Sequence, residues 1–393
     1  MHPKWLLPEF VDDVLPREAK RVELIRRQIL DLFVVHGYEL VSPPLIEYLE
    51  SLLTGSGQDL ELQTFKLVDQ MSGKTLGIRA DVTPQIARLD AHLLDDEGVT
   101  RLCYADRVLR TRPAEGDMSR EAVQLGAELF GCSTITADIE INRLMVQSIR
   151  SVVHRPITID LGSVSIAQSV SDWLELSSEQ SLLFFEALQA KDTAALDDFS
   201  KNYGKDAQKV IMALPKLYGN PSILDTARDV LINVPGAGRG IDEIYSVYQA
   251  IKENVNHVIV DLAELRGFQY HSGLVVSVYV EGEASPIARG GRYDHVGESF
   301  GRSRPATGFT IDLRKLTQCT TELSVEESQR KIWAPCMLDD LDLSAKIKSL
   351  RESGDIVVED ILGAAFDLGS SGYTHKVIKQ GLNWSLVAIK DNK

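Results

Sequence analysis

The alternation of apolar and polar residues is clearest between positions 99 and 131, where it predicts two strands joined by a polar loop. The strands are expected at 101–109 and 120–130, because small or apolar side chains there alternate loosely with polar ones. The polar residues expected at the mouth of this hairpin and on its returning strand are Arg110, Arg112, Arg120, Gln124 and Glu128. Such a cluster suits a small anionic or zwitterionic ligand, and a solvated loop of an acidic protein would explain it as well.

Ahead of this hairpin, the pattern predicts helices separated by short strands. The helices are expected at 17–36, 45–53 and 85–94, and the strands at 38–41, 65–68 and 75–79. The third helix has a start signal, since Pro84 lies in its first turn, with Thr83 as the cap and Asp81 beside it. Capping alone would therefore explain both of these polar residues.

Beyond the hairpin, the pattern predicts a helix, a strand, a long helical segment and three further strands. They are expected at 136–151, 158–161, about 165–256, 257–262, 273–280 and 306–311. Two stretches among these strands, 264–271 and 288–294, place arginine and aromatic residues beside glycines. Gly290 and Gly291 suit either a close approach of the backbone to a ligand or a tight turn with positive φ.

The last part of the chain predicts a separate small domain. Residues 322–330 are polar and are expected to form a linker. The α/β pattern that follows predicts strands at 331–335, 356–358 and 385–389 and helices at 342–353 and 374–380. We therefore expect a core domain at 1–320, with the helical insertion at about 165–256, and a C-terminal α/β domain at 325–393.

Composition and charge narrow the function. The chain has 393 residues and a formal net charge of −15, which argues against broad electrostatic binding of nucleic acid. Its four cysteines form no CxxC pair and have no histidine at metal-ligand spacing, so neither a metal site nor a disulfide framework is indicated. The N-terminus is broken by prolines and acidic residues, and no apolar run reaches 18 residues. We expect a soluble, cytoplasmic protein without a membrane segment.

Several motifs together resemble those of one enzyme class. Residues 8–320 resemble the core of a class II aminoacyl-tRNA synthetase of the histidyl branch. Pro43 ends a helix–strand unit that looks like the first class II motif, and residues 110–124 look like the second. RGFQYHSG at 266–273 and GGRYD at 290–294 resemble the two histidine-specific stretches, and they are the most specific signal. The resemblance implies an α+β fold with an antiparallel sheet core and flanking helices, a helical insertion and a small C-terminal α/β domain.

The resemblance also implies a pocket for free histidine. Acceptors are needed for the α-ammonium, a guanidinium for the carboxylate and polar groups for the imidazole. The residues expected to supply them are Asp81, Thr83, Arg110, Gln124, Arg266, Tyr270 and His271. Among these, Asp81, Thr83 and Gln124 would accept from the ammonium. A strand-edge amide at Gln124 remains an alternative.

The other roles follow from the same resemblance. Arg266 would hold the carboxylate, and Tyr270, with His271, would contact the imidazole. Arg110 stands where the second class II motif has the arginine that meets the α-phosphate of ATP. An ion pair between Arg266 and Glu264 is the alternative explanation for that arginine.

The nucleotide side departs from the synthetase pattern. The synthetase loop continues Arg-His-Glu, but this chain has Arg112 where the carboxylate acceptor should be. The third motif should end in an arginine, but Lys315 stands there and Arg314 precedes it on the opposite face. The tail is also shorter and less basic than an anticodon-binding domain. A retained amino-acid side with an altered nucleotide side resembles the regulatory-subunit family of ATP phosphoribosyltransferase, a synthetase paralogue, as does RADVTPQIARLDA at 79–91.

That resemblance implies a non-catalytic regulatory subunit for the first step of histidine biosynthesis, with no metal or cofactor. It implies that the chain binds and activates the short catalytic subunit and mediates feedback by L-histidine. Class II cores commonly dimerise through the first motif, here 17–44, so we expect a homodimer and a larger hetero-oligomer with the partner. The alternatives are an active histidyl-tRNA synthetase that needs ATP, magnesium and tRNA, and a stand-alone histidine-binding or adenylating protein.

Overall fold

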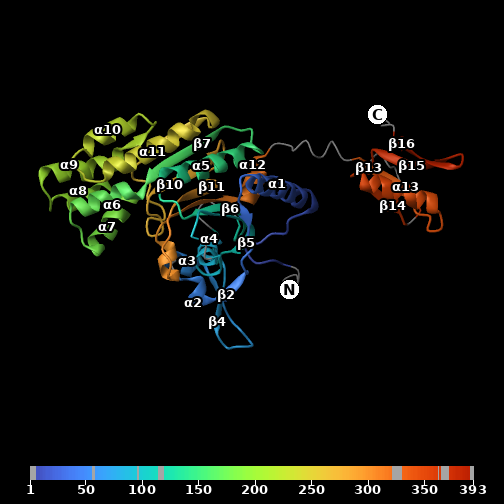
Figure 1. The fold of residues 1–393 in the computed structure, drawn as a ribbon, viewed down its shortest axis with the longest axis horizontal. Helices are drawn as coiled ribbons and strands as arrows, with labels where there is room; N and C mark the ends of the chain where they lie inside the picture. Colours follow the sequence, from blue (N-terminus) through green and yellow to red (C-terminus); the bar gives the residue numbers. More distant parts are fainter. Residues whose placement is uncertain are drawn as a thin grey trace. The chain divides into compact units, whose positions relative to one another are not determined.

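The computed structural model forms two compact units, Met1–Thr321 and Glu322–Lys393, and each is described by itself (Figure 1). It describes residues 6–54, 58–94, 97–113, 119–320, 330–361, 363 and 371–389, without the side chains of 58 and 59. The predicted linker at 322–330 lies almost entirely outside these residues.

A nine-stranded sheet forms the centre of the first unit. In spatial order its strands are β1 (Glu39–Leu40), β5 (Thr100–Leu109), β6 (Glu121–Phe130), β12 (Ala306–Asp312), β11 (Ala288–Arg292), β10 (Leu274–Val280), β7 (Ile157–Ser163), β9 (His257–Asp261) and β8 (Tyr218–Gly219). Neighbouring strands run antiparallel except for two parallel pairs, β1 with β5 and β7 with β9. The hairpin predicted around residues 99–131 is therefore confirmed as β5 and β6.

Helices pack on both faces of this sheet. Figure 1 shows α5 (Ile135–Arg150) and α12 (Leu313–Cys319) on one side of the sheet and α4 (Thr83–Leu89) on the other. The helix α1 (Pro16–Val35) packs on the same face as α12, since the rings of Phe33 and Phe309 lie 5.8 Å apart. Phe309 is buried on that face, so its neighbour Thr310 on β12 points to the opposite face. That second face carries the candidate site.

The segment expected to be helical at about 165–256 consists mostly of helices. Its helices are α6 (Val164–Trp173), α7 (Ser178–Gln189), α8 (Thr193–Ser200), α9 (Lys205–Ala213), α10 (Ile223–Val230) and α11 (Ala237–Ile251). The start of α7 is set by a capping box, in which Ser177 and Gln180 each satisfy a backbone N–H of the other. A capping box is set by residues only three positions apart, so it can be read from the sequence alone.

Three expectations in the first unit were wrong in detail. The helix predicted at 45–53 begins as a strand, β2 (Ile46–Tyr48), and only α2 (Leu49–Leu52) is helical, because β2 pairs with β4 (Thr75–Ile78) next to β3 (Phe65–Val68). Thr83 lies inside α4 and not at its cap, where Val82 stands without a side-chain bond. A short helix, α3 (Gln58–Gln63), was not predicted. The helix predicted at 85–94 is present, as α4 followed by a π-helical turn at Asp90–Leu94.

Gly290 and Gly291 form neither a turn nor a positive-φ position, since both lie within β11. A Cβ on Gly291 would lie 2.5 Å from the carbonyl oxygen of Leu274 and 2.8 Å from Nδ1 of His271. The glycines are therefore required by close packing inside the sheet, which the strand prediction missed.

The second unit is a four-stranded sheet with one helix. The strand order is β14 (Ile356–Asp360), β13 (Lys331–Pro335), β15 (His375–Gln380) and β16 (Asn383–Ala388), and α13 (Leu341–Glu352) follows β13. The helix predicted at 374–380 is wrong. Val377 is buried while Lys379 is exposed, and Gly381 at φ 63° turns the chain into β16, so strand pairing prevails over the helical pattern.

Candidate functional site

A buried carboxylate lies on the face of the main sheet opposite α1 and α12. Glu128 on β6 is 1% exposed and accepts hydrogen bonds from the hydroxyl of Tyr104 at 3.0 Å and from Oγ1 of Thr83 at 3.1 Å. The hydroxyl of Tyr293 also donates to it. Three elements, β5, α4 and the end of β11, thus converge on one side chain.

Two glycines make room for this arrangement. Gly308 on β12 is the register partner of Glu128, and a Cβ there would overlap the carboxylate. Gly126 lies directly between Tyr104 and Thr310 in the sheet, and a Cβ there would collide with the tyrosine ring. Because Gly126 has no side chain, Tyr104 reaches across it to within 2.6 Å of Thr310 Oγ1.

Burial sets the charge state of this group. Burial, with a smaller contribution from the Asp81 carboxylate, raises the pKa of Glu128 to about 8, although the hydroxyl donors oppose the shift. An added N–H donor or cation would favour the ionised form and would lower this pKa again. The carboxyl group is therefore suited to a ligand that brings a donor or a positive charge.

The hydroxyl of Tyr270 is available beside this network. It is buried and has no hydrogen-bond partner among the described residues, and its ring lies 5.1 Å from that of Tyr293. Burial and then the charges of Glu128 and Asp81 raise the pKa of Tyr270, so the phenol stays neutral. A buried hydroxyl without a partner costs free energy, which a polar ligand atom would recover.

Three residues predicted for the ammonium end lie together. Gln124 donates from Nε2 to Asp81 at 3.1 Å and accepts the backbone N–H of Val82 at 2.9 Å. Asp81 accepts the backbone N–H of Thr83 at 2.9 Å. The capping-type contact predicted as the alternative for Asp81 is thus present, while Thr83 turns its hydroxyl to Glu128.

The arginines of the hairpin mouth are held by backbone contacts. Arg110 donates from Nε to the carbonyl oxygen of Ala80 at 3.3 Å, one residue before Asp81. Arg120 donates to the carbonyl oxygen of Arg110 and stacks on Phe65 at 4.8 Å. Arg112 is exposed to solvent.

Arg266 lies beside Glu264, and His271 lies beside the backbone of Arg292. Arg266 is half exposed, and its Nε lies 3.6 Å from Glu264, the ion pair predicted as its alternative. His271 places Nδ1 3.3 Å from the carbonyl oxygen of Arg292, and burial lowers the pKa of His271 to about 4. His271 therefore packs as a neutral ring against β11.

The residues of the third class II motif diverge. Arg314 lies 3.5 Å from Ser119 at the hairpin mouth and 3.7 Å from Glu18, whereas Lys315 donates to Ser285 at 3.0 Å. In the GGRYD stretch, Arg292 forms a buried ion pair with Asp138 at 2.5 Å that ties β11 to α5. That arginine is therefore structural.

Sequence reasoning missed three members of the network around Glu128. They are Tyr104, Tyr293 and Thr310. Glu128 itself was expected in the hairpin cluster beside Gln124, with which it shares a strand face, but it was not assigned to the histidine pocket. Nothing in the local pattern indicated the long-range contacts of the other three.

Comparison with known proteins identifies the family. The family model for histidyl-tRNA synthetase matches residues 10–316, and the model described as ATP phosphoribosyltransferase subunit HisZ C-terminal domain matches residues 329–387. Among curated proteins, the ATP phosphoribosyltransferase regulatory subunit of Cupriavidus necator is 44% identical over 98% of this chain and 100% of its own length. That of Paraburkholderia xenovorans is 43% identical over 97% and 98%. The chain belongs to the family of ATP phosphoribosyltransferase regulatory subunits.

Solved structures agree with this family. A Bacillus halodurans chain described as an ATP phosphoribosyltransferase regulatory subunit/histidyl-tRNA synthetase has a TM-score of 0.80 at 26% identity, covering 95% of this chain and 97% of that one. The histidyl-tRNA synthetase of Nostoc has a TM-score of 0.75 at 19% identity, covering 96% and 91%, and shows the fold alone. The class II fold and the non-catalytic, regulatory-subunit predictions are confirmed.

Two further findings concern the described residues only. No helix among them is long and apolar enough to cross a membrane. They contain no group of three or more His, Cys, Asp or Glu side chains that could hold a metal ion.

Proposed function

We propose that this regulatory subunit binds the short catalytic subunit of ATP phosphoribosyltransferase, activates it, and relays feedback by L-histidine bound in the pocket around Glu128. The observation that carries the ligand assignment is the pairing of a buried carboxyl acceptor with a nearby unsatisfied phenol. An imidazole ring has one N–H donor and one acceptor nitrogen, so it complements Glu128 and Tyr270 together.

The rest of the amino acid fits the remaining groups. The α-ammonium is a donor with three hydrogens, and oxygen acceptors are offered by Asp81, just before α4, and by Gln124 on β6. The carboxylate suits Arg266, which would exchange its exposed ion pair with Glu264 for a bidentate contact. Asp81, Thr83, Arg110, Gln124, Arg266, Tyr270 and His271 thus remain the proposed pocket residues, with Glu128 added and His271 in a packing role.

Regulation requires two states with different histidine affinities. Equal affinity for both would leave the activity of the partner unchanged, however tightly histidine bound. By linkage, substrates bound to the catalytic subunit would change the histidine affinity by the same factor.

An activity assay with the catalytic subunit tests the proposal, and Tyr270→Phe is the informative variant. The hydroxyl has no partner among the described residues, so its removal should leave the free energy of unfolding unchanged or slightly higher. The wild-type chain should raise the rate of the catalytic subunit and histidine should lower it. The variant should activate fully and need about tenfold more histidine for inhibition. Activation without any response to histidine in the wild type would contradict the sensor role.

We also propose a homodimer through the first-motif unit at residues 17–44. The strand β1 lies at an edge of the nine-stranded sheet. Leu40 on β1 is 57% exposed, and Val35 at the end of α1 is 78% exposed. If β1 paired with β1 of a second copy across a two-fold axis, the side chains of Leu40 and Val35 would be covered. Light scattering on the chain alone should give twice the mass of one chain, and a monomer would refute this assembly.

A further inference from the structure

The C-terminal unit exposes large apolar side chains at one edge of its sheet. The strands β13, β14 and β15 are parallel, so their carboxyl ends meet at the same edge. The exposed residues that follow these strands or begin α13 are Met337, Leu338, Leu341, Ile361 and Leu382, and their exposed fractions run from 48% to 89%. We call these five side chains the carboxyl-edge patch.

Polar contacts hold the loops of the patch close together. Asp340 caps α13 through the N–H of Leu343 at 2.9 Å, and it also accepts from Trp384 Nε1 at 3.1 Å and pairs with Lys379 at 3.4 Å. The turn that carries Leu382 is thereby fixed to the start of α13. Because neighbouring strands are about 4.8 Å apart, the three loops span only about 10 Å. The patch is a defined surface and not scattered single residues.

Aspartates surround this patch. Asp339 and Asp342 are exposed beside Leu338 and Leu341, and Asp360 precedes Ile361. Asp340 pairs with Lys379, whereas Asp339 and Asp342 are exposed beside the leucines, so the margin formed by these four side chains is negatively charged. Two copies of the patch would bring like charges together, so self-association here is disfavoured. The complementary surface is apolar with lysine or arginine at its margin.

We propose that the carboxyl-edge patch is a docking surface for the catalytic ATP phosphoribosyltransferase subunit, which meets it with an apolar surface flanked by lysine or arginine. This inference rests on the proposed function. One observation favours that occupant: the patch lies in a unit that the family model of the regulatory subunit matches and the synthetase model does not. The acidic margin of the patch sets the charge that the partner surface must carry.

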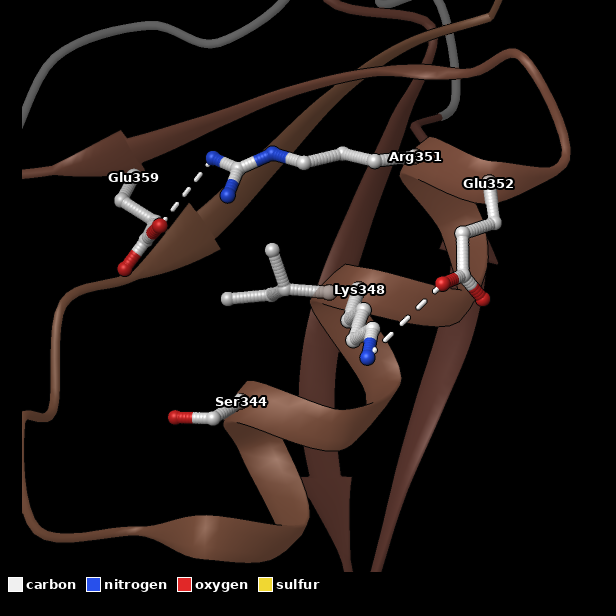
Figure 2. A pocket seen from close by; sticks show the side chains of 6 residues that line it. Ser344, Lys348, Arg351, Glu352 and Glu359 are labelled. Carbon is white, nitrogen blue, oxygen red and sulfur yellow. Dashed lines mark hydrogen bonds and ion pairs between the residues drawn. The ribbon is translucent and has the colours of Figure 1, made fainter.

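A groove in the same unit is a weaker candidate. It runs between α13 and the edge strand β14 and is lined by Ser344, Ile347, Lys348, Arg351, Glu352 and Glu359 (Figure 2). Its charges already pair with one another, since Arg351 lies 3.0 Å from Glu359 and Lys348 lies 3.9 Å from Glu352. Arg351 also donates to the carbonyl oxygen of Val357 at 3.0 Å, which occupies an acceptor on the edge strand. A ligand in this groove would have to break these contacts.

The test uses the full chain and the purified catalytic subunit in a calorimetric titration. Leu338→Ser with Leu382→Ser removes the two most exposed leucines of the patch, both 89% exposed. Each leucine buried on binding should be worth about tenfold in affinity, so the double variant should bind about a hundredfold more weakly. Ile356→Ser is the matched control, since this residue lies at the opposite end of β14. The affinity of this variant for the catalytic subunit should change less than about threefold. Asp339→Asn with Asp342→Asn should reduce the salt dependence of the wild-type association.

The outcomes separate the two proposals. Wild-type binding that the double variant retains would overturn the docking surface and leave the proposed function standing. Failure of the wild type to bind at all would overturn the proposed function itself. A lower mass of the double variant alone, by light scattering, would show that a second copy covers the patch and would also overturn the inference. Circular dichroism checks the fold of the double variant. If that variant loses structure, Leu341→Ser is titrated in its place, and a loss of affinity of less than about tenfold would overturn the inference.

Discussion

The residues of the proposed histidine pocket and the residues that the synthetase pattern would use for ATP are arranged differently in this chain. In the proposed pocket, Glu128, Tyr104 and Thr83 form a closed hydrogen-bond network, and nearby glycines leave room for it. Of the residues expected for ATP, Arg112 is exposed and Lys315 donates to Ser285. Binding groups are thus organised where a ligand would be recognised and not where charge would develop in adenylation.

This difference matters because recognition and catalysis place different demands on a site. Recognition needs a few satisfied groups at fixed distances, and the buried network supplies them. Adenylation needs donors aimed at the phosphates in the transition state, and each one that is lost costs much of the rate. A sensor retains the first set without the second, which agrees with the regulatory family.

The largest expected effect is the absence of amino-acid activation. Each missing phosphate or adenine contact costs about a hundredfold in rate, so changes at Arg112 and Lys315 together should leave activity about four orders of magnitude below that of a synthetase. Histidine-dependent exchange of pyrophosphate into ATP measures it. An exchange rate typical of synthetases would mean that the residues on the ATP side are as well arranged for catalysis as those of the proposed histidine pocket are for binding.

The next effect concerns the glycine beneath the carboxylate. In Gly308→Ala, the new Cβ would overlap Glu128 and force it out of the network. Overpacking of this kind typically costs about 1–3 kcal/mol of unfolding free energy, and histidine affinity should fall by about a hundredfold or more. Calorimetry on the folded variant measures the affinity. Gly204→Ala is the matched control, because nothing lies within 4 Å of a Cβ there.

Much of the fold could be predicted from local pattern, and the site only in part. The hairpin of β5 and β6 and the helical insertion follow from periodicity and turn residues, which act over a few positions. Asp81 and Gln124 came from a family resemblance, and the structure joins them at 3.1 Å. The contact of Tyr293 with Glu128 spans 165 residues, and no local pattern carries such information. The failed helix at 374–380 has the same origin, since pairing with β16 decided its structure.

A smaller effect is expected from the carboxylate end of the ligand. Arg266→Leu should weaken histidine binding by about tenfold to a hundredfold, because a charge-assisted contact is worth about 1.5–3 kcal/mol. The variant should also lose some unfolding free energy, since Arg266 is half exposed but its partner Glu264 is only 14% exposed, so the affinity is compared under conditions in which both proteins are folded. Calorimetry with and without the substitution checks this. Unchanged affinity would move the histidine carboxylate to another group.

A further expected effect is a pH dependence of stability that reports the buried carboxyl directly. The folded pKa of Glu128, about 8, lies above its ordinary value of 4.5, so the native state holds a proton that the unfolded state has lost. Stability from this group is therefore complete below about pH 4.5 and is lost as the pH rises through 8, at about 1 kcal/mol per pH unit.

His271 acts with the opposite sign, which selects the window for the measurement. Its folded pKa of about 4 lies below 6.5, so the unfolded state binds the extra proton and stability rises between these two values. The two groups offset each other below pH 6.5, and Glu128 acts without this opposition from there to pH 8. Burial raises the pKa of Asp160 to about 7, so Asp160 adds a fall of the same sign up to that pH. Urea unfolding between pH 7 and 8 should therefore show a fall in the wild type that Glu128→Gln largely removes, while His271→Gln retains it. A wild type with no fall between pH 7 and 8 would mean that Glu128 is already ionised in the empty pocket, and the pocket would then favour a cationic ligand over a neutral imidazole.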